Sequence, residues 1–454
     1  MSKELYTDAS PSYRDTKLDA AIPPPSLRDI SRRSDQAGNK PERQRNSPYA
    51  PYPNAQQRQQ VSKHQHKHIP QLHPANMAPP PPPVQKPVPP LDLRTSTDFI
   101  KCAQPLDLDA LCSLVQPQAD AGKEDADFLC SESLVHTAVE LREKGRRVPD
   151  QLKLSAKERS NPFARVSQAG FQHAGAVKLA ALDAVFQLLP SSQKTVSFAD
   201  LCGGPGGFTE YLFWRMEQDS QMGYGYGITL KGAEDWQIGD PSHFTQIGGM
   251  GGSGNLLHNE SIYEFDAVVS NDTNKCGVDL VVADGAPHPP CQDDQQLESA
   301  SFQLILRQII TMLTCLKKGG TFVCKFFDLL HEPSANLVWL LYQAFESICV
   351  TKPLASDPTS SERFLICQNL RFQHPTRLID ALLGVSGAFI PRDWLANDED
   401  FMDYLKMRNM KFLLKQIDSL EQMELFIADP DKLCLYDQQD VRRQCLQDWH
   451  LPTS

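Results

Sequence analysis

The sequence predicts an α/β fold built on a mostly parallel, doubly wound, Rossmann-like sheet with helices on both faces. Three observations support this prediction. Short apolar runs rich in β-branched and aromatic residues alternate with longer segments of helical periodicity. One of these runs passes directly into a glycine-rich turn. Charged residues stand at the ends of other runs, where the carboxyl edge of such a sheet binds its ligands.

Composition divides the chain into four parts. Residues 1–95 are rich in Pro, Gln, His and charged residues and poor in aliphatic ones, which predicts a disordered tail. Residues 96–160 form an entry segment with a basic region, and residues 161–378 hold the predicted α/β domain. Residues 379–454 read as a helical extension in which we find no catalytic signature.

The expected elements follow from periodicity and apolar runs. The helix at 297–316 spaces Phe302, Ile305 and Ile309 along one face, as a buried amphipathic helix does. The run at 278–284 is apolar nearly throughout, as in a strand covered on both faces. The other expected strands are 196–201, 225–230, 320–327 and 363–367, and the other expected helices are 125–143, 171–189, 336–350 and one beginning near Thr209.

Composition also limits the class of protein. The 454 residues carry a net charge of −11, which argues against coating nucleic acid by bulk charge but leaves room for a local basic groove. The 12 cysteines include no C-x-x-C pair, so we expect reduced thiols and no metal site. We see no signal-peptide core and no apolar stretch long enough for a bilayer. The expectation is a protein of the nucleus or the cytoplasm with no membrane association.

The glycine-rich turn covers residues 202–208, directly after the strand at 196–201. Glycines allow a sharp turn and a close approach to a bound molecule because they have no Cβ. The spacing matches neither the dinucleotide pattern G-x-G-x-x-G nor a phosphate-binding P-loop. It therefore favours a cofactor with an adenosine but no pyrophosphate, and S-adenosylmethionine (SAM) is the candidate. The alternative is a plain strand-to-helix turn.

Three charged residues fall where the sheet should be buried. Asp284 ends one apolar run, Lys325 interrupts another and Glu362 begins a third. A buried charge is costly unless it is paired, so we expect these side chains to meet in one cleft. The alternative places all three in solvent at strand ends. Lys178, on a helix of small and apolar residues, would by itself read as a surface lysine.

In order along the chain, Lys178, Asp284, Lys325 and Glu362 resemble the K-D-K-E tetrad of the FtsJ-like 2′-O-ribose methyltransferases. Within that superfamily the resemblance is to the cap-specific mRNA enzymes, and it runs from about residue 125 to near the C-terminus. It implies SAM-dependent methylation of the ribose 2′-hydroxyl of the first transcribed nucleotide of 5′-capped mRNA, from cap 0 to cap 1. The segments that carry it are 160–163, 198–211, 214–215, 227–232, 283–285, 324–329 and 361–364.

The resemblance also implies site residues. Asn255 stands where relatives carry an Asp, and an amide keeps hydrogen bonding but loses the negative charge. The loop at 248–254 before it reads equally well as a flexible loop without a ligand. The implied RNA contacts are Lys144, Lys157, Arg159 and Ser360, although the basic segment holding the first three could equally be a solvated face. The implied cofactor contacts are His173, Cys202, Gly203, Gly204, Pro205, Gly206, Gly207, Phe208, Asn255, Leu256 and Asp284.

The implied mechanism uses Lys325 as the general base and Lys178 to steer the hydroxyl, with Asp284 and Glu362 orienting both. A lysine titrates at about 10.4 when unperturbed, so a base must be tuned by desolvation or by neighbouring cations. The alternatives left open are the second cap nucleotide, another RNA, and a cap-binding scaffold without catalysis. A nicotinamide-dependent dehydrogenase lacks the required glycine spacing.

Capped mRNA is the expected partner, together with the transcription or capping machinery. No G-patch, guanylyltransferase-like region or WW module, which the larger animal members carry, is visible in the sequence.

Overall fold

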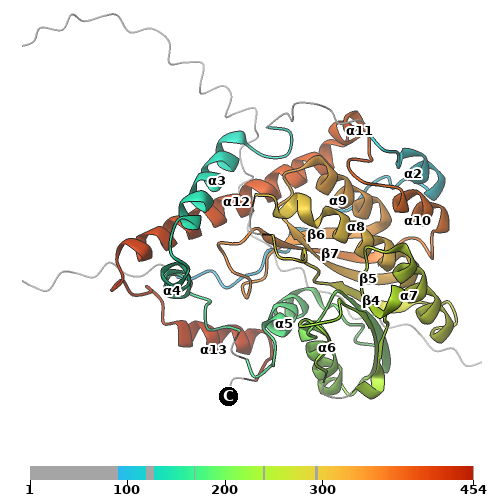
Figure 1. Cartoon of the computed structure of the whole chain (residues 1–454), viewed down its shortest axis with the longest axis horizontal. Coiled ribbons are helices and arrows are strands. Elements are labelled where there is room, and N and C mark those ends of the chain that lie inside the picture. The colour runs from blue at the N-terminus through green and yellow to red at the C-terminus, as the bar shows by residue number, and fades with distance from the viewer. Residues whose placement is uncertain (1–89, 119–126, 168, 239–240, 292–294, 453–454) are drawn as a thin grey trace, which may run out of the picture. The chain divides into compact units, whose positions relative to one another are not determined.

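A computed structural model of the chain describes residues 90–118, 127–167, 169–238, 241–291 and 295–452 (Figure 1). The tail predicted at 1–95 therefore lies almost wholly outside the described residues. Within the described part, no helix is both long and apolar enough to cross a membrane.

A seven-stranded sheet lies at the centre of the fold, in the order β3-β2-β1-β4-β5-β7-β6. The strands from β3 to β5 in this order run parallel, and β7 runs antiparallel to both of its neighbours. The prediction of a mostly parallel sheet is thus confirmed. The strands are β1 Thr195–Leu201, β2 Met222–Ile228, β3 Phe244–Gln246, β4 Val278–Ala283, β5 Leu316–Phe327, β6 Phe345–Thr351 and β7 Glu362–Leu370.

Helices cover both faces of the sheet (Figure 1). Strand β1 shows why, because Val196 and Phe198 point into one core and Ala199 and Leu201 into the other. The first core is closed by α5 Ala174–Phe186 and α6 Gly207–Gln218. The second is closed by α7 Asn259–Asp272, α8 Leu297–Cys315 and α9 Glu332–Ala344.

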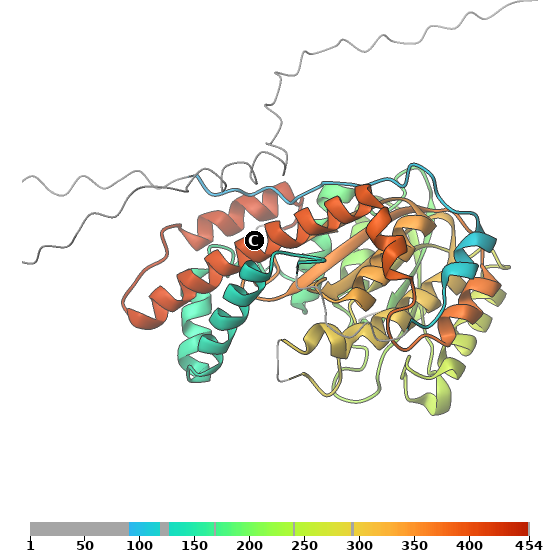
Figure 2. The ribbon, with the colours of Figure 1, turned by 90° about the horizontal axis from the view of Figure 1, so that it is seen from above.

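A third core joins segments from the two ends of the described chain. The helices α3 Glu132–Arg146 and α4 Asp150–Ser160 lie against α12 Glu399–Ala428 (Figure 2). Leu141 and Ala156 are buried there against Leu420 of α12. The prediction of a helical C-terminal region is confirmed. The remaining helices are α2 Leu108–Leu114, α10 Thr376–Leu383, α11 Arg392–Asn397 and α13 Gln438–Asp448.

The position for a ligand follows from strand order. After β1 the chain moves to β2 on one side, and β4 then returns to pair with β1 on the other. The carboxyl ends of β1 and β4 therefore face a crevice that no crossover helix fills. The glycine-rich turn follows β1 and Asp284 follows β4, so both lie at this edge.

Part of the predicted element pattern was wrong. Residues 336–350 do not form one helix, because α9 ends at Ala344 and the chain continues as β6. Phe345 is already extended, with φ −114° and ψ 161°, and β6 pairs along its length with β7. Tertiary pairing here overrides local helical periodicity. The strand expected at 225–230 lies at Met222–Ile228, and α4, α7 and β3 were not predicted.

The edge strand β6 is covered by an earlier part of the chain. Ile100 pairs with Ile348, with N–O distances of 2.9 and 3.0 Å in the two directions. Arg408 of α12, fully buried, fixes this strap. Its guanidinium donates to the Val350 carbonyl and to Ser96 Oγ at 2.9 Å, and pairs with Asp98. A covered edge cannot pair with another chain.

Arg408→Met should therefore loosen the strap. We expect the free energy of unfolding to fall by about 2–4 kcal/mol, since a buried guanidinium network is broken. Arg443→Met, which removes an exposed pair with Asp440 on α13, should change it by less than about 0.5 kcal/mol. Chemical denaturation measures both variants. Equal losses in the two would contradict the role given to Arg408.

Candidate active site

Lys325 and Asp284 meet at the carboxyl edge of the sheet. Strands β4 and β5 are in parallel register with Ala283 beside Cys324, so the two next residues are neighbours. Lys325 is buried, with its Nζ 3.0 Å from Asp284 Oδ1. The same ammonium donates to the Asp284 carbonyl at 2.7 Å. This pairing is what a charge inside a sheet requires.

Glu362 and Lys178 form the second pair. Glu362 begins β7 opposite Phe327, and its Oε2 lies 2.8 Å from Nζ of Lys178 on α5. Ser356 donates its hydroxyl to Oε1 at 2.6 Å. Burial opposes the charge of Glu362, but Lys178 and Lys325 outweigh it and lower the pKa of this carboxyl to about 2.

The two pairs form one electrostatic cluster. Burial by itself would lower the pKa of Lys178, but Glu362 and Asp284 together raise it above its ordinary value. Each carboxylate thus acts on a lysine of the other pair, as Lys325 acts on Glu362. The structure brings together the three residues that the sequence placed in one cleft and Lys178, which the family resemblance added to them. Such a cluster can hold a hydroxyl group and accept its proton.

The glycine-rich turn is compressed against protein atoms. A Cβ on Gly203 would lie 2.0 Å from Oδ1 of Asp200, and one on Gly204 only 1.9 Å from the Glu234 carbonyl oxygen. Asp200, fully buried, accepts a 2.8 Å hydrogen bond from Thr209 Oγ1, and burial raises its pKa to about 7. These two glycines are therefore required by the packing of the turn itself, a reason the sequence did not reveal.

The buried polar atoms near the turn include two that have no hydrogen-bond partner or ion pair within the described residues. They are Oδ1 of Asp200 and Nε2 of His173, the N-cap residue of α5. A Cβ on Gly207 would lie 3.2 Å from His173 Cβ, which places this histidine against the turn. Buried polar atoms are costly unless they are hydrogen-bonded. The donor and acceptor groups of SAM suit such atoms, so the residues present fit this cofactor.

Other predicted cofactor residues have different surroundings. The Phe208 side chain is buried, with its ring centroid 6.3 Å from that of Phe364. Leu256 is buried in the second core. Phe208 and Leu256 could therefore contact a ligand only through their backbone atoms or by shaping the pocket around it. Asn255 Oδ1 accepts a 3.0 Å hydrogen bond from the Leu257 N–H. The amide of Cys202 donates to the Ile228 carbonyl at 2.7 Å, which ties the turn to β2.

The loop at 248–254 is held against the end of β2. Gly254 N–H donates to the Gly248 carbonyl at 2.6 Å, and Lys231 N–H donates to the Ser253 carbonyl at 3.0 Å. Gly254 has φ +67°, and a Cβ there would lie 1.6 Å from the Thr229 carbonyl oxygen. A glycine is thus needed at this position for packing. Contact between Asn255 and a cofactor stays a prediction.

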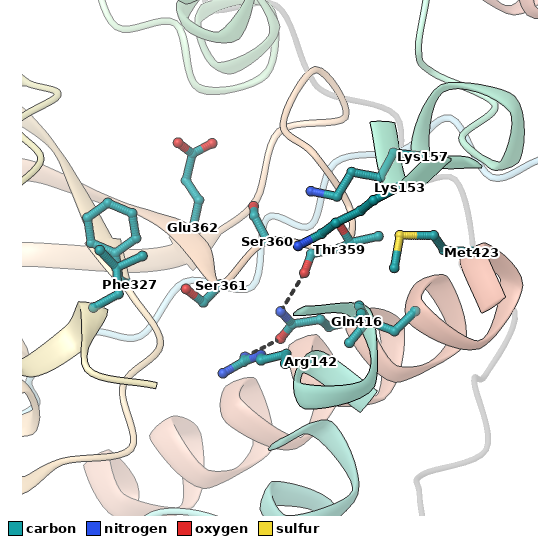
Figure 3. A pocket seen from close by; sticks show the side chains of 13 residues that line it. Arg142, Lys153, Lys157, Phe327, Thr359, Ser360, Ser361, Glu362, Gln416 and Met423 are labelled. Atoms are coloured by element: carbon teal, nitrogen blue, oxygen red, sulfur yellow. Dashed lines mark hydrogen bonds between the residues drawn. The ribbon is translucent and has the colours of Figure 1, made fainter. Parts of the chain in front are cut away.

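A basic cleft adjoins the cluster (Figure 3). Lys153 and Lys157, one turn apart on α4, extend toward Thr359 and Ser360 on the opposite wall. Glu362 lines the same cleft, so bound phosphates would lie close to the charged cluster. The Lys157 ammonium also pairs with Asp357 at 2.8 Å.

The floor of the cleft includes a buried network from the helical extension. Gln416 of α12 donates through Nε2 to the Thr359 carbonyl at 2.8 Å (Figure 3). Arg142 donates to Gln416 Oε1 at 2.7 Å and to Asp328 Oδ2 at 2.9 Å. Sequence analysis found no functional residue after 380, and a lone glutamine in a long helix gives no local signal.

The predicted RNA contacts divide into two groups. Lys157 and Ser360 line the cleft. Lys144 and Arg159 do not belong to its lining. Lys144 is 62% exposed and lies 3.8 Å from Glu424, and Arg159 donates to the carbonyls of Phe426 at 2.9 Å and Lys432 at 3.0 Å. Arg159 thus secures the end of α12, and RNA contact by either residue stays a prediction.

Sequence reasoning missed Ser356 and Lys352, which hold the segment before Glu362. Lys352 directly follows β6, and its ammonium donates to three oxygens of Ser360 and Glu362. The incorrect helix at 336–350 hid this connection. The β-branched and aromatic residues of 345–351 were the signal that could have revealed the strand.

Comparisons with known proteins agree with this geometry. Residues 171–370 match the family described as FtsJ-like methyltransferase. The protein named cap-specific mRNA (nucleoside-2'-O-)-methyltransferase 1 from Dictyostelium discoideum is 32% identical over 328 residues, which are 65% of this chain and 43% of that protein. The Mus musculus protein of the same name is 32% identical over 363 residues, which are 72% of this chain and 43% of that protein. The Homo sapiens protein of that name is 30% identical over 364 residues, which are again 72% of this chain and 43% of that protein. The chain spans less than half the length of these curated relatives.

Gly204→Ala should distort the turn, because its Cβ would collide with the Glu234 carbonyl oxygen. We expect a loss of about 1–3 kcal/mol in the free energy of unfolding and weaker SAM binding. Gly387→Ala, where the added Cβ meets open space, is the control and should preserve both. Thermal denaturation and calorimetric titration with SAM measure the two effects. Unchanged SAM affinity in Gly204→Ala would contradict the tight packing of this turn.

The low pKa of Glu362 predicts a pH-dependent contribution to stability. A carboxyl whose pKa is lower in the folded state stabilises it above the unfolded value, 4.5, and loses this effect as pH falls toward about 2. The destabilisation caused by Glu362→Gln should therefore be full near neutral pH and shrink below pH 4.5. Glu346→Gln, at an exposed site on β6, serves as the control. Urea denaturation across this range tests the prediction, and a pH-independent difference would refute it.

Proposed function

We propose, from the premise that residues 171–370 form an FtsJ-like methyltransferase domain, that this protein methylates capped RNA. The methyl group would pass from SAM to the ribose 2′-hydroxyl of the first transcribed nucleotide of 5′-capped mRNA, converting cap 0 to cap 1. The observation that carries the proposal is the cluster of Lys178, Asp284, Lys325 and Glu362 at the sheet edge that also bears the glycine-rich turn.

The chain's residues divide the chemical work. SAM, when bound, supplies a methyl group already activated by its sulfonium. Lys178, whose pKa is raised by Glu362 and Asp284 against burial, remains an ammonium that can orient the hydroxyl. The role of proton acceptor then falls to Nζ of Lys325, which Asp284 holds in place. Alignment of the hydroxyl with the methyl group supplies much of the rate in a transfer of this kind.

The basic cleft supports a substrate rich in phosphate. Lys153 and Lys157 present two ammonium groups beside Glu362, in a protein whose overall charge is −11. Binding of RNA must therefore depend on this local charge, and it should weaken as salt rises. The curated relatives are named for cap-specific mRNA methylation, which favours a cap triphosphate as the occupant.

Two other RNA targets fit the same chemistry, the second cap nucleotide and an uncapped RNA. A cap-binding scaffold without catalysis is less favoured, because all four cluster positions are filled and paired. Capped transcripts arise in the nucleus, so we propose the nucleus as the site of action, with the cytoplasm as the alternative. The transcription or capping machinery would be the partner there.

Lys325→Ala should reduce methyl transfer by about 10³-fold, the size expected when a general base is removed. SAM affinity should stay within about twofold, because Lys325 serves the hydroxyl rather than the turn. Lys318→Ala, on the exposed start of β5, is the control and should retain full activity. Mass spectrometry of a capped oligonucleotide incubated with SAM counts and locates the added methyl group.

Three results of that assay would change the proposal. Near-normal turnover by Lys325→Ala would remove the assigned base. A methyl group on the second nucleotide, or equal activity on uncapped RNA, would replace the substrate. SAM binding with no transfer to any RNA would favour the scaffold.

A further inference from the structure

Lys352 is a half-buried lysine to which the mechanism above gives no role. It directly follows β6, and its side chain crosses the turn that leads into β7. Its ammonium donates to the Ser360 carbonyl at 2.9 Å, to Ser360 Oγ at 3.0 Å and to the Glu362 carbonyl at 3.1 Å. Three acceptors match the three donors of an ammonium.

These acceptors belong to the basic cleft and to the charged cluster. Ser360 lines the basic cleft, and Glu362 carries the carboxylate paired with Lys178. One ammonium therefore fixes the wall of the cleft and the backbone of a cluster residue together. Ser356, from the same segment, holds the Glu362 side chain through its 2.6 Å hydrogen bond.

We propose that Lys352, in its protonated form, is a positioning residue that places Glu362 and Ser360 correctly relative to each other for the methyl transfer. The inference rests on the proposed function and assigns Lys352 no contact with substrate. Its effect would be exerted through the Glu362–Lys178 pair. When the ammonium loses a proton, one of the three acceptors loses its donor and the turn is less firmly held.

The charges around Lys352 give this positioning a pH dependence. The pKa of Lys352 is lowered to about 7, first by burial and then by the positive charge of Arg363. The negative charges of Glu362, Asp357 and Asp328 act in the opposite direction. These groups come from β7, from the turn and from the segment after β5. The ammonium is thus present below about pH 7 and lost as pH rises through that value. Methyl transfer should therefore show a falling limb above about pH 7.

Two substitutions separate positioning from simple stability. Lys352→Met keeps an unbranched apolar stem, one atom shorter, but donates nothing, whereas Lys352→Arg keeps a charge that persists at high pH. Lys317→Met is the matched control, because Lys317, near the start of β5, also pairs through its ammonium with a buried partner, Asp279, but at the opposite edge of the sheet. The measurements are kcat and KM across pH 6–9, SAM affinity, and hydrogen exchange of the amides at 356–362.

We expect Lys352→Met to lose about tenfold or more in kcat, the usual effect of displacing a catalytic group by a fraction of an ångström. SAM affinity should stay within about twofold, and the falling limb should disappear. Lys352→Arg should recover part of the activity and remain active above pH 8. Lys317→Met should preserve the kinetics and the limb, even if it lowers stability.

The proposal is overturned if Lys352→Met keeps kcat within about twofold and the same limb, or if Lys352→Arg leaves the limb unchanged. Should Lys352→Met fail to fold, the Lys352→Arg profile decides by itself. Failure of the proposed function would look different, because the unsubstituted protein itself would then transfer no methyl group to capped RNA. In that case hydrogen exchange tests the positioning role. Faster exchange of the amides at 356–362 in Lys352→Met than in Lys317→Met supports that role, and equal exchange rates in the two variants refute it.

Discussion

The ion pair between Lys178 and Glu362 is the constraint on which the site depends. A carboxylate buried at the start of β7 is tolerated only because an ammonium from α5 and a hydroxyl from the preceding turn meet it. That meeting requires β7 to pair antiparallel with β5, which brings Glu362 opposite Phe327 and close to Lys325. The antiparallel insertion in an otherwise parallel sheet is thus what closes the charged cluster.

The helical layer outside the sheet completes the site rather than simply covering it. Asp328 receives both Arg142 of α3 and Arg363 of β7, at 2.9 and 3.4 Å. Arg142 continues through Gln416 of α12 to the wall of the cleft. Segments more than 250 residues apart in sequence, as Arg142 and Gln416 are, therefore share one buried network. Removing one member would leave a buried polar group of another without its hydrogen-bond partner.

Sequence alone could predict the sheet and the four cluster residues, and it failed where long-range contacts decide. Asp284 and Lys325 interrupt apolar runs at strand ends, and that is a local signal of a buried site. The segment at 345–351 has apolar residues compatible with a helix, and only pairing with β7 makes it a strand. Lys352, Ser356 and Gln416 are ordinary polar residues in the sequence, and their importance comes from partners brought in by the fold. Likewise, the hydrogen bond from Arg159 to the Phe426 carbonyl could not be predicted from the sequence, because the two residues are brought together only by the fold.

The pairing of Ile100 with Ile348 has a practical consequence for shortened forms of this protein. The boundary of the matched family lies at residue 171, yet the last strand of the sheet is sealed by a segment some 70 residues upstream. A fragment cut at the family boundary would lose both backbone hydrogen bonds between Ile100 and Ile348, and would leave these groups of β6 exposed. Such fragments should self-associate edge to edge, so the smallest well-behaved unit begins before Ser96.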